Sequence, residues 1–381
     1  MSKFKIGLLF HPQLDIGGVE THILSLLRVS DKTLYTWVVI APTSLHFKAQ
    51  VEALGGQVID WQLRNPLLDL ANLLRLIRIL QDEGVDLLHI HSPRAFLVGR
   101  MAALFSHLPC VVTVHLDFDD LYRLGTSFPA EIRRCLALWL ERVLNHILPP
   151  RVTKVIFVSA HTYQIALKHR QILPSQAVVI PNGITLSKFQ STKQHLSIRQ
   201  QQETAQADVV LCYVGRLHTK KGIEILLQAL KKIKTEITWR LWIVGDGELR
   251  SSLENLAAEL GIVERLSFFG FREDVESFLQ AADIFVLPSF YEGFGMAVLE
   301  AMAAGLPCVA TPVGEIASLI EDGVNGFLVP LGDAPALATA LTSLIEDPLL
   351  RQQMGQASSR RAANFSEDEM VARLLQVYKI A

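Results

Sequence analysis

The sequence predicts an α/β protein built from two domains, each a doubly wound parallel sheet. Its 381 residues exceed the roughly 100 to 200 residues of one compact domain, and half of them are hydrophobic. Short runs rich in Val, Ile, Leu and Phe recur along the chain, and most precede a longer segment with helical spacing. Because these runs do not alternate between polar and apolar residues, we expect strands that are buried on both faces, as in parallel sheets.

These runs form two series. The first series predicts strands at residues 5–10, 37–41, 86–91, 110–115, 154–159 and 177–180. The second predicts strands at residues 208–214, 239–244, 265–269, 283–287, 307–310 and 326–329. Helical patterns accompany the second series at residues 222–234, 247–260, 273–281, 295–304 and 334–346. Repeated alternation of strand and helix is typical of doubly wound sheets.

A polar stretch separates the two series. Residues 190–207 contain six Gln and few apolar residues, so they cannot supply a core strand and are interpreted as a linker or mobile loop. We therefore expect a first domain at residues 1–189, a second at 208–365 and a final helix at 366–381. In open parallel sheets, ligands bind beyond the carboxyl ends of the strands. Two such sheets predict a site in the cleft between the domains.

Composition excludes several classes of protein. Lys and Arg number 36 against 38 Asp and Glu, so there is no general electrostatic reason to bind nucleic acid. The four Cys are far apart in the sequence, which favours neither a disulfide framework nor a zinc site and fits a reducing cytoplasm. The first apolar run is too short for a signal peptide, and no run reaches the ~18 residues of a membrane span.

Two loops suit an anionic ligand. Gly17 and Gly18 follow the first predicted strand and precede a helical pattern, where glycines let the backbone approach a ligand and the helix amino terminus favours an anion. Arg216 follows a second strand, and Lys221 opens the next helix. A cation at that end opposes the helix macrodipole, so a bound diphosphate is the expected partner. The alternative for Gly17 and Gly18 is a purely structural turn, and the alternative for Arg216 and Lys221 is a solvated basic turn.

Residues 292–305 are the most informative segment. From Met296 to Ala304 the predicted helix is apolar except at Glu300, and a carboxylate on a buried helix needs hydrogen-bond donors, which ribose hydroxyls would provide. The amides of Gly293 to Gly295 precede the same helix and suit a phosphate or sugar hydroxyls. A structural carboxylate whose hydrogen bonds are satisfied within the protein is the alternative.

Glu292 and Glu300 stand eight residues apart, the EX7E motif, and this segment resembles the retaining glycosyltransferases of family 4, which have the GT-B fold. The other matching motifs are Gly17-Gly18, Ile180-Pro181-Asn182-Gly183, Gly215-Arg216, Lys221-Gly222, Val244-Gly245-Asp246-Gly247 and Phe269-Gly270-Phe271. The matches run from residue 6 to about residue 330. The order of the motifs along the chain makes a chance agreement improbable.

The resemblance implies a role for each matched position. Arg216 and Lys221 would hold the diphosphate of a nucleotide-sugar, Glu300 the ribose, and the backbone near Phe271 and Arg272 the base. Glu292 and the amides of residues 293–296 would hold the sugar and the distal phosphate. The implied donor-binding residues are Gly18, Arg216, Lys221, Phe271, Arg272, Glu292, Gly293, Phe294, Gly295, Met296, Leu299 and Glu300. The implied catalytic residues are His115, matching the family's active-site histidine, and Glu292.

The activity that the resemblance implies is retaining transfer of a hexose from a nucleotide-sugar, UDP-hexose and first UDP-glucose, to a saccharide or lipid-linked saccharide in polysaccharide or glycolipid biosynthesis. The first domain would bind the acceptor and the second the donor, and residues 366–381 would pack back on the first domain. Neither a metal nor another cofactor is expected. Two routes to retention of the anomeric configuration stay open. The acceptor attacks from the face that the nucleotide leaves, or the sugar first forms a covalent intermediate with Glu292.

Rival functions also stay open. A nucleotide-sugar epimerase, a phosphorylase and a non-catalytic nucleotide-sugar-binding subunit would share the fold. A Rossmann dehydrogenase is disfavoured because neither half has GxGxxG after its first strand.

Three weaker signals have competing interpretations. Asp117 to Asp120 contain a DxD, which we interpret as a solvated acceptor-side loop rather than a metal site. His89 and His91 lie two apart at a strand end, and without a third ligand structural roles are favoured. Residues 131–151 combine an amphipathic pattern with four Arg. They indicate either peripheral contact with the inner face of the cytoplasmic membrane or packing on the domain core.

Overall fold

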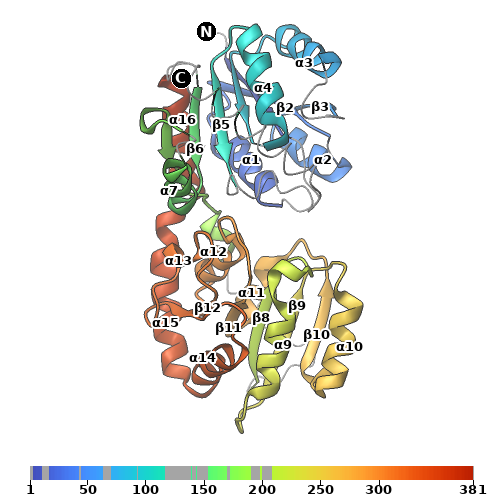
Figure 1. Ribbon diagram of the computed structural model, residues 1–381, viewed down its shortest axis with the longest axis vertical. Helices are drawn as coiled ribbons and strands as arrows, with labels where there is room; N and C mark the ends of the chain where they lie inside the picture. Colours follow the sequence, from blue (N-terminus) through green and yellow to red (C-terminus); the bar gives the residue numbers. More distant parts are fainter. Residues whose placement is uncertain are drawn as a thin grey trace. The chain divides into compact units, whose positions relative to one another are not determined.

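The computed structural model forms two compact units, and each is described by itself (Figure 1). Unit 1 comprises Met1–Gly183 and Glu367–Ala381, and unit 2 comprises Ile184–Ser366. The structure describes residues 3–10, 17–42, 44–62, 70–91, 93–115, 139, 143, 153–169, 172–189, 198–199 and 208–380.

Unit 1 contains a parallel sheet in the order β3-β2-β1-β4-β5-β6-β7. Its strands are β1 (Phe4–Leu9), β2 (Tyr35–Ile40), β3 (Gln57–Ile59), β4 (Leu87–Ile90), β5 (Cys110–Val114), β6 (Thr153–Phe157) and β7 (Ala177–Val179). Its helices are α1 (Gly17–Val29), α2 (Leu45–Ala53), α3 (Leu70–Asp82), α4 (Pro93–Phe105), α7 (Ala160–Lys168) and α16 (Glu367–Ile380), with a 3-10 turn at η1 (Pro174–Gln176). The strand order reverses between β1 and β4, which places a topological switch point there.

Each face of the unit 1 sheet has its own apolar core. Successive side chains of a strand point to opposite faces, so Leu8 joins the cluster beneath α1 and α2 while Leu9 joins the cluster beneath α3 and α4. The last helix, α16, belongs to the first of these faces through Leu374. Arg28 of α1 also donates to Glu367 at 2.7 Å. The carboxy-terminal helix is therefore part of the core of unit 1.

Unit 2 contains a second parallel sheet in the order β10-β9-β8-β11-β12-β13. Its strands are β8 (Val209–Val214), β9 (Trp239–Val244), β10 (Leu266–Gly270), β11 (Ile284–Leu287), β12 (Cys308–Ala310) and β13 (Gly326–Leu328). Its helices are α9 (Ile223–Lys232), α10 (Arg250–Leu260), α11 (Val275–Ala281), α12 (Met296–Ala303), α13 (Ile316–Leu319), α14 (Ala334–Glu346) and α15 (Pro348–Ala362). The 3-10 turns are η2 (Leu186–Phe189), η3 (Thr219–Lys221), η4 (Val263–Arg265) and η5 (Ala363–Phe365). The switch point of this sheet lies between β8 and β11.

The predicted α/β fold with two doubly wound parallel sheets is confirmed. The predicted strands of unit 2 agree with the observed ones to within one or two residues, because a strand buried on both faces is a continuous apolar run. The structure adds β3, which the sequence did not predict. It is three residues long and lies at the sheet edge, and Gln57 is exposed, so it lacks the apolar signature of the central strands.

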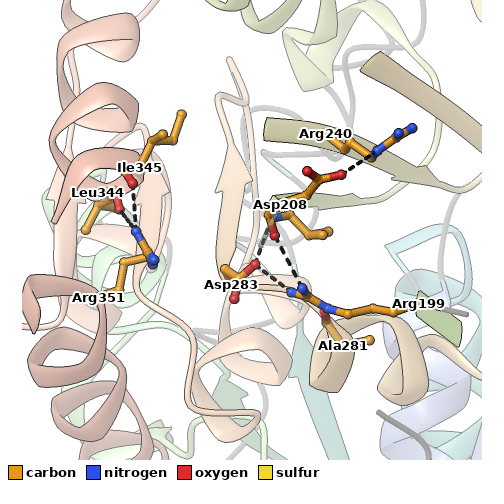
Figure 2. A network of polar contacts seen from close by, with 9 residues as sticks. Arg199, Asp208, Arg240, Ala281, Asp283, Leu344, Ile345 and Arg351 are labelled. Carbon is orange, nitrogen blue, oxygen red and sulfur yellow. Dashed lines mark hydrogen bonds and ion pairs between the residues drawn. The ribbon is translucent and has the colours of Figure 1, made fainter. Parts of the chain in front are cut away.

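Most of the polar stretch at residues 190–207 lies outside the described residues, but Ile198 and Arg199 belong to unit 2. The Arg199 guanidinium donates to the Ala281 carbonyl at 2.8 Å and to the Asp283 carboxylate at 2.6 Å (Figure 2). Asp283 in turn accepts from the Val210 amide at 2.7 Å. These contacts lie at the amino ends of β8 and β11, the sheet edge opposite the candidate site.

Among the described residues, no helix has the length and apolar character needed to cross a membrane. The amphipathic segment 131–151 lies outside the described residues except for Trp139 and Val143, and Trp139 is 58% exposed.

Candidate active site

The carboxyl ends of β8 and β11 lead into loops that carry most of the predicted donor-binding residues. Arg216 follows β8, and Lys221 lies in η3 immediately before α9. Glu292 follows β11, and the loop from Gly293 to Gly295 leads into α12, which carries Glu300. Because β8 and β11 are neighbours at the switch point of unit 2, their loops meet at one edge of the sheet. This is where open α/β sheets bind ligands.

Lys221 and Glu292 are in direct contact. The Lys221 Nζ atom lies 2.6 Å from Glu292 Oε1, and the side chains are 26% and 11% exposed. Ser289 Oγ donates to the same carboxylate oxygen at 2.8 Å. The cation expected at the diphosphate and the carboxylate expected at the sugar therefore form one charge-assisted hydrogen bond in a partly desolvated place.

Glycines allow the two loops to approach this closely. Gly222 has a φ of 65°, and a Cβ atom there would lie 2.1 Å from the Pro288 carbonyl oxygen. The Phe290 amide donates to the Lys220 carbonyl at 2.8 Å, which links the β8 and β11 loops through the backbone. Any residue with a side chain at position 222 would separate the loops and displace Lys221 from Glu292.

Arg216 also has a carboxylate partner. Its Nη2 atom lies 3.5 Å from Glu248, which follows β9, and His218 Nε2 lies 3.4 Å from the same carboxylate. Tyr213 donates its hydroxyl to the Arg216 carbonyl at 3.0 Å. His218 caps η3, since its Nδ1 accepts from the Lys220 amide at 3.1 Å. Glu248 is 51% exposed, so solvent weakens this pair relative to Lys221 and Glu292.

Glu300 lies on a helix that is otherwise apolar. In α12 the side chains of Val298, Leu299, Ala301 and Met302 are fully buried. Burial, together with the negative charge of Glu276, raises the pKa of Glu300 to about 7, while the positive charge of Lys188 partly opposes this shift. The carboxylate is therefore held in a place where hydrogen-bond donors from a ligand would favour its charged form.

The start of α12 presents backbone amides. Gly295 has a φ of 83° at the cap position and provides no side-chain hydrogen bond to the first turn. These amides and the positive end of the helix dipole suit a phosphate or sugar hydroxyls. Phe294 is buried at 5% exposure, and it anchors the loop that leads into the helix.

The predicted base-binding segment follows β10 at the same edge of the sheet. Phe271 is 78% exposed. Arg272 forms two hydrogen bonds of 2.8 Å with Asp274. The Arg272 side chain is thus engaged locally, which leaves the backbone as the part of this segment suited to a base.

In unit 1, His115 belongs to a cluster of four histidines at the carboxyl edge of the sheet. His115 follows β5, His89 and His91 lie at the end of β4, and His22 lies on α1. His91 Nδ1 is 3.3 Å from His115 Nε2, and the His22 ring lies 5.2 Å from that of His91 and 5.3 Å from that of His115. Gly18 is in the first turn of the same helix, α1.

The remaining contacts of the cluster determine its charge. His22 Nδ1 donates to Asn182 Oδ1 at 3.0 Å, so in the neutral ring Nε2 bears a lone pair. His89 bonds Tyr378 of α16 and Thr113, both at 2.6 Å. Burial lowers the pKa of all four histidines, that of His22 to about 4. The cluster is therefore neutral at pH 7.

His22 was not singled out in the sequence, although a signal was present. Val19, Ile23 and Leu26 form the buried stripe of α1, and position 22 falls on that stripe at helical spacing. Its Nε2 atom and that of His91 are buried without a hydrogen-bond partner among the described residues. The sequence signal for His22 was its position as a polar residue on the buried stripe of the helix that follows the first strand.

His89 contacts Tyr378 and Thr113, and His91 contacts His115. The structural roles expected for His89 and His91 stay a prediction. Within the described part of the chain, no group of three or more His, Cys, Asp or Glu side chains is placed to hold a metal ion. The DxD segment at residues 117–119 lies outside the described residues.

Comparisons with known proteins relate the chain to glycosyltransferases. The chain matches the family described as "Glycosyl transferases group 1" over residues 195–361 and the family described as "Glycosyltransferase Family 4" over residues 16–188. It is 30% identical over 319 residues to an Escherichia coli protein named UDP-Gal:alpha-D-GlcNAc-diphosphoundecaprenol alpha-1,3-galactosyltransferase, covering 81% of this chain and 79% of that protein. It is 28% identical over 386 residues to a phosphatidyl-myo-inositol mannosyltransferase of Mycobacterium leprae, covering 98% and 96%.

A solved structure shares the fold over nearly the whole chain. HepE of Anabaena, in complex with UDP and glucose, superposes with a TM-score of 0.83 at 23% identity, covering 99% of this chain and 100% of that one. The two sheets, their order of strands and this likeness establish the GT-B fold. The chain belongs to the group 1 glycosyltransferases of family 4.

Proposed function

We propose that this glycosyltransferase moves a hexose from a UDP-hexose to a saccharide or lipid-linked saccharide, with retention of the anomeric configuration. The observation that carries the proposal is the meeting of Arg216, Lys221, Glu292 and the start of α12 at the switch point of unit 2. Two cations, a carboxylate and the amino terminus of a helix at one sheet edge suit a diphosphate joined to a sugar.

The chemistry of transfer explains why these groups are useful. Breaking the bond between the anomeric carbon and the diphosphate oxygen leaves positive charge on the sugar and negative charge on the departing diphosphate. Lys221 and Arg216 would neutralise the departing charge, which is greater in the transition state than in the bound donor. Glu292 would accept hydrogen bonds from the sugar hydroxyls and Glu300 from the ribose. With two protein cations at the diphosphate, we propose a reaction that needs no metal.

His115 would contact the transferred sugar as a neutral group. Burial lowers its pKa, and its Nε2 is already engaged with His91 Nδ1 at 3.3 Å. Its Nδ1 is the ring atom suited to a substrate hydroxyl. A neutral imidazole orients a hydroxyl without placing a positive charge beside the developing oxocarbenium character of the sugar.

The relatives support the choice of donor and acceptor. The name of the E. coli relative specifies UDP-Gal and a GlcNAc-diphosphoundecaprenol acceptor, and the HepE structure contains UDP and glucose. UDP-glucose and UDP-galactose are therefore the first donors to test, with a polyprenyl-diphosphate sugar as acceptor. Such an acceptor lies in a membrane, so we further propose that the protein acts at the cytoplasmic membrane surface through residues 131–151.

The test is a transfer assay with purified protein. UDP-glucose, UDP-galactose and GDP-mannose are each supplied with a short-chain lipid diphosphate GlcNAc acceptor, in EDTA and again with magnesium. We expect transfer from a UDP-hexose in EDTA, and NMR of the fresh product should show the anomeric configuration of the donor. Inversion would refute retention. Epimerisation of the donor without acceptor would indicate an epimerase, and turnover that depends on phosphate would indicate a phosphorylase. Failure to bind any nucleotide would overturn the proposal.

A further inference from the structure

The cation at the proposed diphosphate site is already engaged by a carboxylate of the protein. Lys221 Nζ lies 2.6 Å from Glu292 Oε1, and the carboxylate is only 11% exposed. A phosphate oxygen that binds the same ammonium group either replaces Glu292 or lies beside it. In the first case Glu292 loses its cation, and in the second two negative groups share one cation in a partly desolvated place. Glu292 therefore opposes the binding of a bare diphosphate.

Hydrogen bonds hold together the two loops that carry Lys221 and Glu292. Ser289 Oγ donates to Glu292 Oε1 at 2.8 Å, and the Glu315 amide donates to the carbonyl of the next residue, Gly293, at 3.2 Å. The Lys221 loop is linked to the β11 loop by the Phe290 amide at 2.8 Å from the Lys220 carbonyl. The competition between Glu292 and a phosphate for Lys221 is thus built into the two loops.

We propose that Glu292 makes the enzyme prefer its nucleotide-sugar donor over the product nucleotide by competing for Lys221. The inference rests on the proposed function and deepens it. When the donor binds, the sugar hydroxyls replace the hydrogen bonds that Glu292 gives up, so the opposition is relieved. After transfer the sugar is gone, and among the described residues Ser289 is the other side chain that donates to Glu292. The carboxylate then recovers Lys221 from the diphosphate. Release of the product UDP is thereby favoured.

The other cation provides an internal comparison. Arg216 pairs with Glu248 at 3.5 Å, but Glu248 is 51% exposed and follows β9. It does not belong to the β11 loop from which the proposed sugar site is built. Glu248 therefore opposes UDP and UDP-hexose to the same small extent, and removing its charge leaves the preference between them unchanged.

The experiment compares binding of uridine, UDP and UDP-glucose by calorimetry in EDTA. The proteins are the natural protein, Glu292→Gln, Glu248→Gln and the control Glu321→Gln, which removes an exposed carboxylate paired with Arg361 at 3.6 Å. Glu292→Gln should tighten UDP binding by about tenfold, because a hydrogen bond between charged groups no longer competes. UDP-glucose binding should stay level or weaken, and uridine binding should not change. Glu248→Gln should tighten both phosphate ligands by about twofold.

The outcomes separate this inference from the proposed function. Suppose that the natural protein binds UDP but Glu292→Gln does not bind UDP more tightly, or that the substitution raises the affinities for UDP and UDP-glucose equally. In either case the competition proposed for Glu292 is wrong and the transferase proposal stands. If the natural protein binds no uridine nucleotide, both fall. Unchanged uridine binding shows that the variant is folded. If it is not, Glu292→Asp withdraws the carboxylate from Lys221 and should shift the preference in the same direction by a smaller factor.

Discussion

Glu300→Gln should stabilise the ligand-free protein above neutral pH while it weakens nucleotide binding. Burial and the charge of Glu276 raise the pKa of Glu300 from 4.5 to about 7. In the unfolded chain the carboxyl ionises at its ordinary pKa, so the native state resists ionisation between pH 4.5 and 7. Its contribution to stability is thus greatest at acid pH and declines as the pH rises through this window. Gln has nearly the same shape and no charge.

The magnitude follows from the size of the shift. Each pKa unit corresponds to about 1.4 kcal/mol, so the displacement from 4.5 to about 7 sets an upper limit of roughly 3 kcal/mol at pH 8. At pH 5 the same calculation gives less than about 1 kcal/mol. Between pH 5 and pH 8 the free energy of unfolding of the variant should therefore rise by about 2 kcal/mol relative to that of the natural protein. Contact of the carboxylate with water reduces this difference.

The assay is urea unfolding of both proteins at pH 5 and pH 8, with UDP titrations at each pH. Glu276→Gln serves as a second variant, since it removes a neighbouring charge and should lower the pKa of Glu300. If the ribose hydroxyls donate to Glu300, UDP affinity of the natural protein should rise across pH 7 more steeply than that of Glu300→Gln. A stability difference that does not change with pH would refute the argument from burial. Unchanged UDP affinity in Glu300→Gln would show a structural carboxylate.

Three further variants test other parts of the molecule. Lys221→Ala should weaken UDP binding and turnover together, by about tenfold or more, because it removes a cation from the diphosphate; unimpaired kinetics would refute its placement. Gly222→Ala should lower both stability and turnover, since its Cβ would lie 2.1 Å from the Pro288 carbonyl oxygen, and calorimetric unfolding checks this. Charge reversal by Arg133→Glu with Arg134→Glu should sharply reduce sedimentation with anionic liposomes; equal binding, or none by either protein, would remove the membrane proposal.

The sequence predicted the central elements better than the peripheral ones. Strands such as β8, buried on both faces, are continuous apolar runs and were placed to within about a residue. Helix α15 was missed because its residues are mostly polar. Its start was nevertheless marked, since Asp347 accepts from the Leu350 amide at 2.9 Å and Pro348 occupies the first turn. Those are ordinary signals of a helix amino terminus.

The contacts between residues of the candidate site could not be predicted from the sequence, for a different reason. Lys221 and Glu292 belong to separate sequence motifs that lie 71 residues apart. Their contact depends on β8 and β11 being neighbours in the sheet. Glu248 was included in the helical pattern at residues 247–260, where nothing distinguished its carboxylate from those of an exposed helix. Pairing between loops is set by strand order and loop conformation, which single-sequence patterns do not encode.

The two units should respond to pH in opposite directions. In unit 1 burial lowers the pKa values of His22, His89, His91 and His115. A histidine whose native pKa is lowered contributes stability above its ordinary value of 6.5, and this is lost as the pH falls toward the native value. His22, with a pKa of about 4, alone accounts for up to about 3 kcal/mol at 1.4 kcal/mol per unit. In unit 2, Glu300 has the opposite effect.

Calorimetry between pH 5 and 8 tests this opposition. A protein of two units can show two unfolding transitions, and adding UDP identifies that of unit 2, because a ligand stabilises the unit that binds it. The unit 1 transition should rise with pH and the unit 2 transition should fall. Glu300→Gln should reduce the pH dependence of the unit 2 transition without affecting that of unit 1. His22→Gln should reduce the pH dependence of the unit 1 transition only, and His89, His91 and His115 should supply what remains of it. Parallel movement of both transitions would mean that the buried histidines and Glu300 do not govern the pH dependence of their units.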